Sequence, residues 1–272
     1  MTKIAVLMAA YNAEKTLVEA VESVLLNQAP LHLFIVDDGS VRHVIDLLPA
    51  RDNLTILRLD KNVGLPTALN HGLDVILKQN FPYIARADAD DISLPTRFEK
   101  QMAFLENHPE IDLVGCWIRL FDEDTRETIM SLSPPPTSQE IKNRMYSNSA
   151  LYHPTWFMRA AVFRDVGFYN TSYETAQDYD FLRRLIKKHQ VANIPEYLLD
   201  YCISQKGISF QKRRRQLTVR LEVQWRMFEI ANWRCYVGMG KTICLIAVPF
   251  SLVNRVKKLV YGRKISQGGT PS

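Results

Sequence analysis

Short apolar runs and segments with apolar residues at helical spacing alternate along the first ninety residues. The apolar runs cover residues 4–10, 31–36, 54–59 and 83–87, and the helical patterns cover residues 14–27 and 65–78. The apolar runs predict strands, with the run at 4–10 buried on both faces, and the intervening patterns predict amphipathic crossover helices. The alternation therefore predicts an α/β domain with a mostly parallel sheet that is flanked by helices on both faces.

The remaining chain predicts fewer elements and ends in a different kind of segment. We expect helices at 97–107 and 178–188, a strand at 113–121, and a stiff surface excursion at the Ser-Pro-Pro-Pro stretch 133–136. A helical stretch at 211–231 is followed by a mostly apolar run of 12 residues, 242–253. We therefore divide the chain into an α/β domain, residues 1–205, and a partly apolar helical extension, residues 206–272.

Polar residues follow each predicted strand at its carboxyl end. They are Tyr11 and Asn12, Asp37 and Asp38, Lys61 and Asn62, and the segment from Asp88 to Asp91. In a doubly wound sheet the ligand crevice lies outside the carboxyl ends of the strands. We therefore expect these residues to meet in one site.

Three acids, Asp88, Asp90 and Asp91, lie within four positions of one another. Like charges this close are unfavourable unless a cation offsets them, and oxygen ligands without His or Cys suit Mg²⁺ or Mn²⁺, which bind substrate phosphates as well. As an alternative, Asp91 caps the helix that follows. The Asp37-Asp38-Gly39-Ser40 sequence is by itself equally consistent with a simple turn.

Composition and charge narrow the class of protein. With 47% apolar and 23% charged residues, the 272-residue chain falls outside the disordered and fibrous classes. The four cysteines form no CxxC pair, which favours free thiols in a reducing compartment. We expect no signal peptide and no membrane span, because the 12-residue run covers roughly 18 Å of a roughly 30 Å hydrocarbon core.

The net charge of +5 is unevenly distributed. From Lys206 onward the chain has 14 Lys or Arg residues and two acids, a net charge of +12, so residues 1–205 carry −7. A basic, partly apolar extension predicts attraction to an anionic membrane surface. The alternative is a C-terminal helix that packs on the α/β domain and exposes a basic face to solvent.

Read in order, the motifs resemble those of the family 2 glycosyltransferases with the GT-A fold, especially bacterial members that build surface polysaccharides. The resemblance covers about residues 3–200. The matching stretches are 8–14 (MAAYNAE), 36–40 (VDDGS), 62–72 (NVGLPTALNHG), 85–98 (ARADADDISLPTRF), 153–155 (HPT) and 177–180 (QDYD).

This resemblance implies a UDP-sugar donor, Mn²⁺ or Mg²⁺, and inversion at the anomeric carbon. It makes Asp178 the general base and places Asp90 and Asp91 at the metal, with His153 and Gln177 as candidates for the acceptor or a phosphate. The nucleotide-binding positions that it implies are Tyr11, Asn12, Asp37, Asp38, Lys61 and Asp88. Two positions depart from the family pattern: Ala10 replaces a usual Pro, and Gln177 replaces a common Glu, which implies a different acceptor preference.

The function implied is transfer of a hexose or N-acetylhexosamine to a saccharide acceptor, lipid-linked in the favoured interpretation, during synthesis of lipopolysaccharide, capsule or exopolysaccharide. The expected location is the cytoplasm or the inner face of the cytoplasmic membrane. One alternative is a nucleotidyltransferase, although the loop of residues 9–14 lacks the Gly, Lys or Arg that would hold a triphosphate. Another is a nucleic-acid-binding protein that uses the basic extension, which the acidic body disfavours, so we expect no nucleic-acid partner.

Overall fold

A computed structural model describes residues 3–204 and 212–248. Its strands are β1 (Ile4–Ala10), β2 (Leu31–Asp37), β3 (Leu54–Arg58), β4 (Tyr83–Asp88), β5 (Ile92–Ser93), β6 (Ile111–Asp122), β7 (Thr128–Leu132), β8 (Phe157–Arg159) and β9 (Gln190–Ile203). Its α-helices are α1 (Leu17–Leu25), α2 (Leu65–Leu77), α3 (Arg97–Asn107), α4 (Ser138–Arg144), α5 (Val162–Val166), α6 (Gln177–Leu185), α8 (Arg213–Arg226) and α9 (Trp233–Ala247). Two single-turn 3₁₀ helices lie at Val44–Asp46 and His153–Thr155.

The strands form one mixed sheet in the order β3-β2-β1-β4-β8-β6-β9-β5, with β7 paired to β6. Strands β3, β2, β1 and β4 are parallel to their neighbours, and the long pairing between β6 and β9 is parallel as well. The short strand β8 runs antiparallel to both β4 and β6. The expected mostly parallel sheet is confirmed, and its antiparallel pairings are the short ones.

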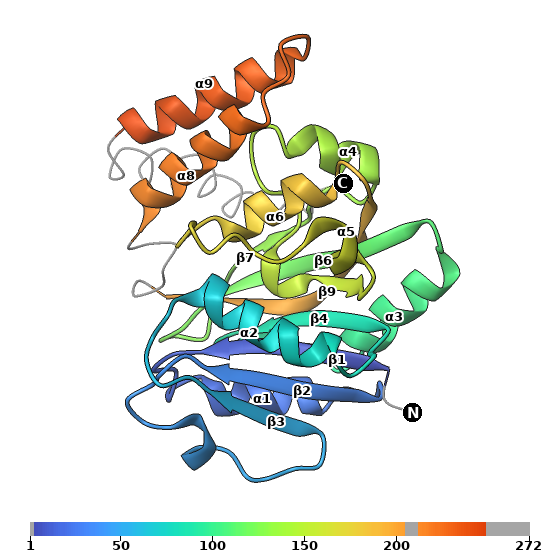
Figure 1. Cartoon of the computed structure of the whole chain (residues 1–272), viewed down its shortest axis with the longest axis vertical. Coiled ribbons are helices and arrows are strands. Elements are labelled where there is room, and N and C mark those ends of the chain that lie inside the picture. Colours follow the sequence, from blue (N-terminus) through green and yellow to red (C-terminus); the bar gives the residue numbers. More distant parts are fainter. Residues whose placement is uncertain (1–2, 205–211, 249–272) are drawn as a thin grey trace.

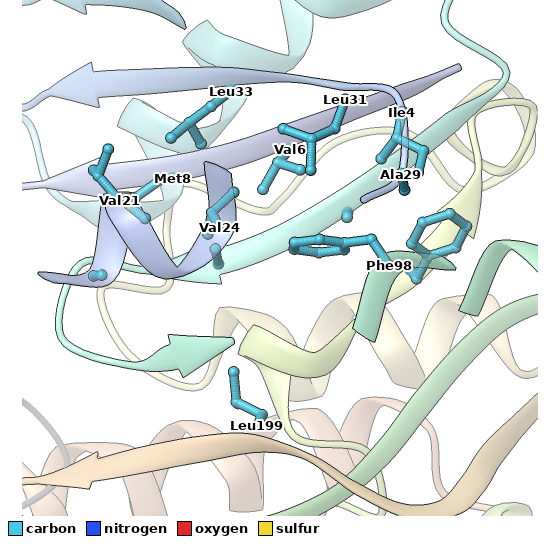
Figure 2. Close-up of a cluster of buried hydrophobic side chains, with 14 of the residues drawn as sticks. Ile4, Val6, Met8, Val21, Val24, Ala29, Leu31, Leu33, Phe98 and Leu199 are labelled. Carbon is cyan, nitrogen blue, oxygen red and sulfur yellow. The ribbon is translucent and has the colours of Figure 1, made fainter. Parts of the chain in front are cut away.

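Helices cover both faces of this sheet (Figure 1). Successive side chains of β1 point to opposite faces, so Ile4, Val6 and Met8 enter one core while Ala5 and Leu7 enter the other. Figure 2 shows the first core, in which α1 and Phe98 of α3 pack against β1 and β2. The prediction of strands buried on both faces is confirmed for β1, in which every residue except the half-buried Ala9 is buried.

The α8 and α9 helices pack against each other at the end of the molecule opposite β3 (Figure 1). Val219 and Val223 of α8 are buried in the second core, so the start of the extension packs on the α/β domain. This agrees with the packed-helix interpretation of that segment. The predicted boundary at residue 205 and the second half of the apolar run, 249–253, lie outside the described residues.

Two other expectations can be compared with the structure. All four cysteines, Cys116, Cys202, Cys235 and Cys244, are free thiols, as predicted. Within residues 3–204 and 212–248, no helix has the length and apolar character needed to cross a membrane.

Candidate active site

The four parallel strands end side by side and bring their polar residues to one edge of the sheet. In the register of the sheet, Ala10 of β1 pairs with Asp37 of β2, and Ala9 pairs with Asp88 of β4. Asp37 in turn pairs with Arg58 near the end of β3. The structure therefore brings together the loops that the sequence predicts to form one site.

Hydrogen bonds join the loop after β1 to the loop after β2. The backbone N–H of Asn12 donates to Ser40 Oγ at 3.0 Å, and the N–H of Val41 donates to Asn12 Oδ1 at 2.9 Å. Asn12 has a φ of +49°, a conformation that Asn tolerates better than most residues. The predicted nucleotide position Asn12 thus has an observed part in shaping the loop, while the neighbouring Tyr11 is 51% exposed at its rim.

Asp37 and Asp38 are buried and bonded to the main chain. Asp37 accepts from the N–H groups of Ser40 (2.9 Å) and Val44 (3.1 Å) and pairs with Arg58. Burial alone would raise the pKa of Asp37, but these hydrogen bonds hold it below its usual range. Organising the loop is therefore the observed role of Asp37, and its contact with a nucleotide stays a prediction.

Asp38 connects the loop after β2 to the loop after β3. Its two carboxylate oxygens accept from the N–H groups of Val63 (2.8 Å) and Gly64 (3.0 Å). Gly39 has a φ of +72° and lies against the backbone of Lys61 and Asn62, so a Cβ at this position would collide with Lys61. The turn interpretation of this tetrapeptide is thus correct, and the turn also positions exposed Lys61 beside the site.

A buried arginine beneath the site fixes Asp88. Arg86 is 1% exposed, forms an ion pair with Asp88 and donates to the carbonyl oxygen of Leu7 at 2.7 Å. Its Nε lies 3.3 Å from His153 Nε2, which is 2.8 Å from the hydroxyl of Tyr169. Burial, and then the charge of Arg86, keep the pKa of His153 well below its usual range. The structure therefore supports a structural role for His153, while acceptor or phosphate contact by His153 stays a prediction.

The three acids that follow β4 differ in their surroundings. Asp91 is 4% exposed and accepts from the N–H of Cys202 in β9 at 2.7 Å, so it ties the loop to the far part of the sheet. Asp90 is half-buried and has no ion pair among the described residues. Burial, and then the charge of Asp88, raise the pKa of Asp90 to about 7. Asp91 also forms no ion pair among the described residues, and its Oδ2 is buried without a hydrogen-bond partner, so neither acid is balanced by a cation in direct contact.

This donor set suits a hard divalent cation that is completed by substrate oxygens. In the part of the chain that the structure describes, no three His, Cys, Asp or Glu side chains are grouped closely enough to hold a metal alone. Mg²⁺ and Mn²⁺ typically bind through one or two carboxylates together with substrate phosphates. The half-buried carboxylate of Asp90 fits this mode, whereas Asp91 is more deeply buried and has one oxygen bonded to Cys202.

Asp178 lies in the first turn of α6, within electrostatic reach of Asp88. The helix begins at Gln177, and the residue before it, Ala176, has a φ of +57° that is rare for alanine. Burial raises the pKa of Asp178, and the nearby charge of Asp88 raises it further. Because Asp178 opens the helix predicted at 178–188, it could also have been the N-cap residue, but it lies inside the observed helix and Ala176 is the N-cap. Gln177 is buried beside it, at 6% exposure.

The sequence did not reveal two further residues of this site. Tyr201 of β9 has a pKa well above its usual value because it is buried and because the charges of Asp91, Asp88, Asp90 and Asp178 surround it. Arg220 of α8 lies within electrostatic reach of Asp178. Tyr201 belongs to a strand that we did not predict, and Arg220 belongs to a basic run that is typical of a solvated surface.

Comparisons with known proteins agree with this geometry. The family model described as glycosyl transferase family 2 matches residues 5–167. The amylovoran biosynthesis glycosyltransferase AmsE of Erwinia amylovora is 32% identical over 83% of this chain and 85% of its own length. An Escherichia coli protein named UDP-Gal:alpha-D-GlcNAc-diphosphoundecaprenol beta-1,3-galactosyltransferase is 27% identical over 86% of each chain.

Solved structures share the fold. The Staphylococcus aureus TarS fragment 1–349 in complex with UDP-GlcNAc superposes with a TM-score of 0.65 at 16% identity, covering 89% of this chain and 71% of the fragment. The same fragment in complex with UDP gives a TM-score of 0.61 at 18% identity, covering 89% and 70%. At these identities the likeness supports the expected α/β sheet architecture.

Proposed function

Because the chain belongs to the family 2 glycosyltransferases, we propose that it moves a hexose or N-acetylhexosamine from a UDP-sugar to a saccharide acceptor in the synthesis of a cell-surface polysaccharide. The observation that carries the proposal is that Asp178 lies within electrostatic reach of Asp88, which ends β4 at the carboxyl edge of the sheet. The named relatives support the donor and acceptor classes, since one is named for amylovoran biosynthesis and another for transfer from UDP-Gal to GlcNAc-diphosphoundecaprenol. A nucleotidyltransferase or a nucleic-acid-binding protein is not favoured.

The proposed reaction is a single displacement in which Asp178 acts on the acceptor. Its carboxylate takes the proton of the attacking hydroxyl while that oxygen forms a bond to the anomeric carbon. The bond from this carbon to the diphosphate breaks, and UDP leaves with the electron pair. Attack from the face opposite UDP inverts the anomeric carbon. The raised pKa of Asp178 makes it a better proton acceptor than an ordinary aspartate.

We further propose that Mn²⁺ or Mg²⁺ is the cofactor and that Asp90 holds it together with the donor diphosphate. When bound, such a cation offsets the negative charge that develops on the departing UDP. An ion pair with Arg86 holds Asp88, which lies two residues before Asp90. One oxygen of Asp91 already accepts a hydrogen bond from the N–H of Cys202. Contact of Asp91 with the metal stays a prediction.

The test of the function is ligand binding followed by product analysis. We expect UDP with Mn²⁺ to raise the melting temperature, while RNA leaves it unchanged, since a ligand that binds only the folded state stabilises it. A panel of UDP-sugars with saccharide acceptors then identifies the product by mass. Stabilisation by RNA but not by UDP would overturn the proposal.

We also propose that the α8–α9 pair docks on a bilayer that contains anionic lipid. Along α9, Trp233, Tyr236, Val237 and Ile243 are between 51% and 63% exposed at helical spacing, so one apolar face is uncovered. Arg213 to Arg215 begin α8, and residues 249–272 add five Lys or Arg residues and no acid. An apolar helix face flanked by cations is typical of interfacial helices that bind anionic lipid. A membrane location suits a lipid-linked acceptor.

The variant Trp233→Ser/Val237→Ser is expected to bind anionic vesicles at least about tenfold more weakly, because each buried apolar side chain contributes roughly 1.5–3 kcal/mol. Vesicle flotation at low salt measures this loss. Truncation within α9 is a poorer test because it removes buried Thr242. The control is Val41→Ser/Ile45→Ser, which removes two exposed apolar residues from the α/β domain. Equal flotation of the wild-type protein, the α9 variant and the control variant would contradict membrane docking by α9.

A further inference from the structure

Three cations from three helices lie within electrostatic reach of one another near the end of α4. Arg144 ends α4, Arg220 lies in the middle of α8, and Lys241 lies in α9. The charges of Arg144 and Arg220 both act on Lys241, and after burial they are the causes that lower its pKa. We call these three residues the cationic cluster.

Contacts at Tyr146 bring the three helices together. Gln224, one turn after Arg220 on α8, donates to the carbonyl oxygen of Tyr146 at 2.8 Å. Gly238, nearly one turn before Lys241 on α9, lies so close to the same carbonyl that a side chain there would collide with it. Both helices therefore approach Tyr146, two residues beyond Arg144, and the cationic cluster is built by tertiary packing.

The described acids form no ion pair with the cationic cluster. Among the described residues, no ion pair or side-chain hydrogen bond is formed by Arg144, Arg220 or Lys241. The other charges close to this segment are Glu229, which accepts from the Tyr146 hydroxyl at 3.2 Å, and Arg183, whose guanidinium lies 4.8 Å from the centre of the Tyr146 ring. Three converging cations without a counter-ion favour binding of a multiply charged anion.

Arg220 connects the cationic cluster to the candidate base. Its guanidinium lies 5.7 Å from the ring centre of Tyr179, the residue that follows Asp178 in α6. Arg220 and Asp178 interact electrostatically but do not form an ion pair, so the charge of Arg220 remains available to a ligand. An anion on the cationic cluster would thus lie near the acceptor hydroxyl rather than at the carboxyl ends of β1 and β2.

We propose that Arg144, Arg220 and Lys241 bind the diphosphate group of the acceptor. This inference rests on the proposed function and specifies its acceptor as a glycosyl diphosphate, the class to which lipid-linked saccharides belong. When such an acceptor carries a single sugar, the diphosphate is attached to the same sugar that carries the attacking hydroxyl. Binding of the diphosphate on the cationic cluster therefore orients that sugar toward Asp178.

The experiment compares two soluble probes by calorimetric titration in the presence of saturating UDP. One probe is GlcNAc α-diphosphate with a short alkyl chain, and the other is the neutral octyl glycoside of GlcNAc. We expect Arg220→Gln and Lys241→Gln each to weaken binding of the diphosphate probe about tenfold, as expected for loss of one charge-assisted contact, and to leave the neutral probe unchanged. The control is Lys187→Gln, which removes an exposed charge beyond the end of α6.

The possible outcomes are distinct. Unchanged binding of the diphosphate probe in both variants overturns the inference, and so does weaker binding of UDP, which would assign the cations to the donor. Loss of vesicle flotation with unchanged probe binding would assign them to phospholipid head groups and overturns it too. Thermal melting shows whether Arg220→Gln folds, and exposed Lys241 provides the second variant. If wild-type protein fails to bind UDP at all, it is the proposed function that fails.

Discussion

The Asp178→Asn variant is expected to transfer sugar about 10²–10⁴-fold more slowly than the wild-type protein, because it loses the carboxylate that accepts the proton of the attacking hydroxyl. Asparagine keeps the shape of the side chain. It also stays in the first turn of α6, where loss of a negative charge costs about 0.3–1 kcal/mol. The rate should therefore fall without unfolding, and UDP affinity should barely change because the base acts on the acceptor.

The pH dependence of the wild-type enzyme tests the same assignment. Burial raises the folded-state pKa of Asp178 above that of an ordinary aspartate, so its carboxylate becomes protonated at a higher pH. As pH falls through this raised pKa, the base is lost and the rate should decrease, whereas it should stay level as pH rises above it. Initial rates at saturating donor give this profile, and its acidic limb should be absent from the residual rate of Asp178→Asn.

A matched control is available two residues away from the catalytic position. Asp180 is two residues further along α6 and forms an ion pair with Arg184 at 2.9 Å. Asp180→Asn should transfer sugar at close to the wild-type rate. If Asp180→Asn stops transfer while Asp178→Asn does not, the base is Asp180 and our assignment is wrong.

The sequence predicts those strands and helices that have a clear local pattern of apolar residues. Strands β1 to β4 and helices α1 to α3 have apolar patterns of the right length, and the observed bounds differ from the predicted ones by at most three residues. The short strand β8 has only three residues, and β9 is interrupted at Pro195 and Glu196, where its pairing with β6 shifts register. Those strands depend on long-range pairing, which no local pattern reveals.

The same distinction applies to the site. The acids were predictable because they directly follow strands, and the carboxyl ends of parallel strands meet. Arg86 was not assigned a role from the sequence. Its neighbours in the apolar run do not show whether its side chain is buried and supports Asp88 or is exposed to solvent. Tyr201 and Arg220 reach the site from β9 and α8, far away in the sequence, so only the folded structure brings them to Asp178.

The Asp90→Ala variant is expected to lose at least about 10³-fold in transfer rate and the Mn²⁺-dependent part of UDP affinity, because a bound cation contributes several kcal/mol to the stabilisation of charge on the leaving group. Asp90 has no protein partner for its charge among the described residues, and its pKa is raised to about 7 by burial and by Asp88. Its removal should therefore leave the fold intact. UDP titrations with and without Mn²⁺, together with rates in EDTA, measure the effect.

The control Asp52→Ala removes an exposed acid from the loop before β3 and should respond to Mn²⁺ as the wild type does. Full turnover of the wild-type protein in EDTA, or Mn²⁺-enhanced UDP binding by Asp90→Ala, would show that Asp90 does not hold a catalytic metal.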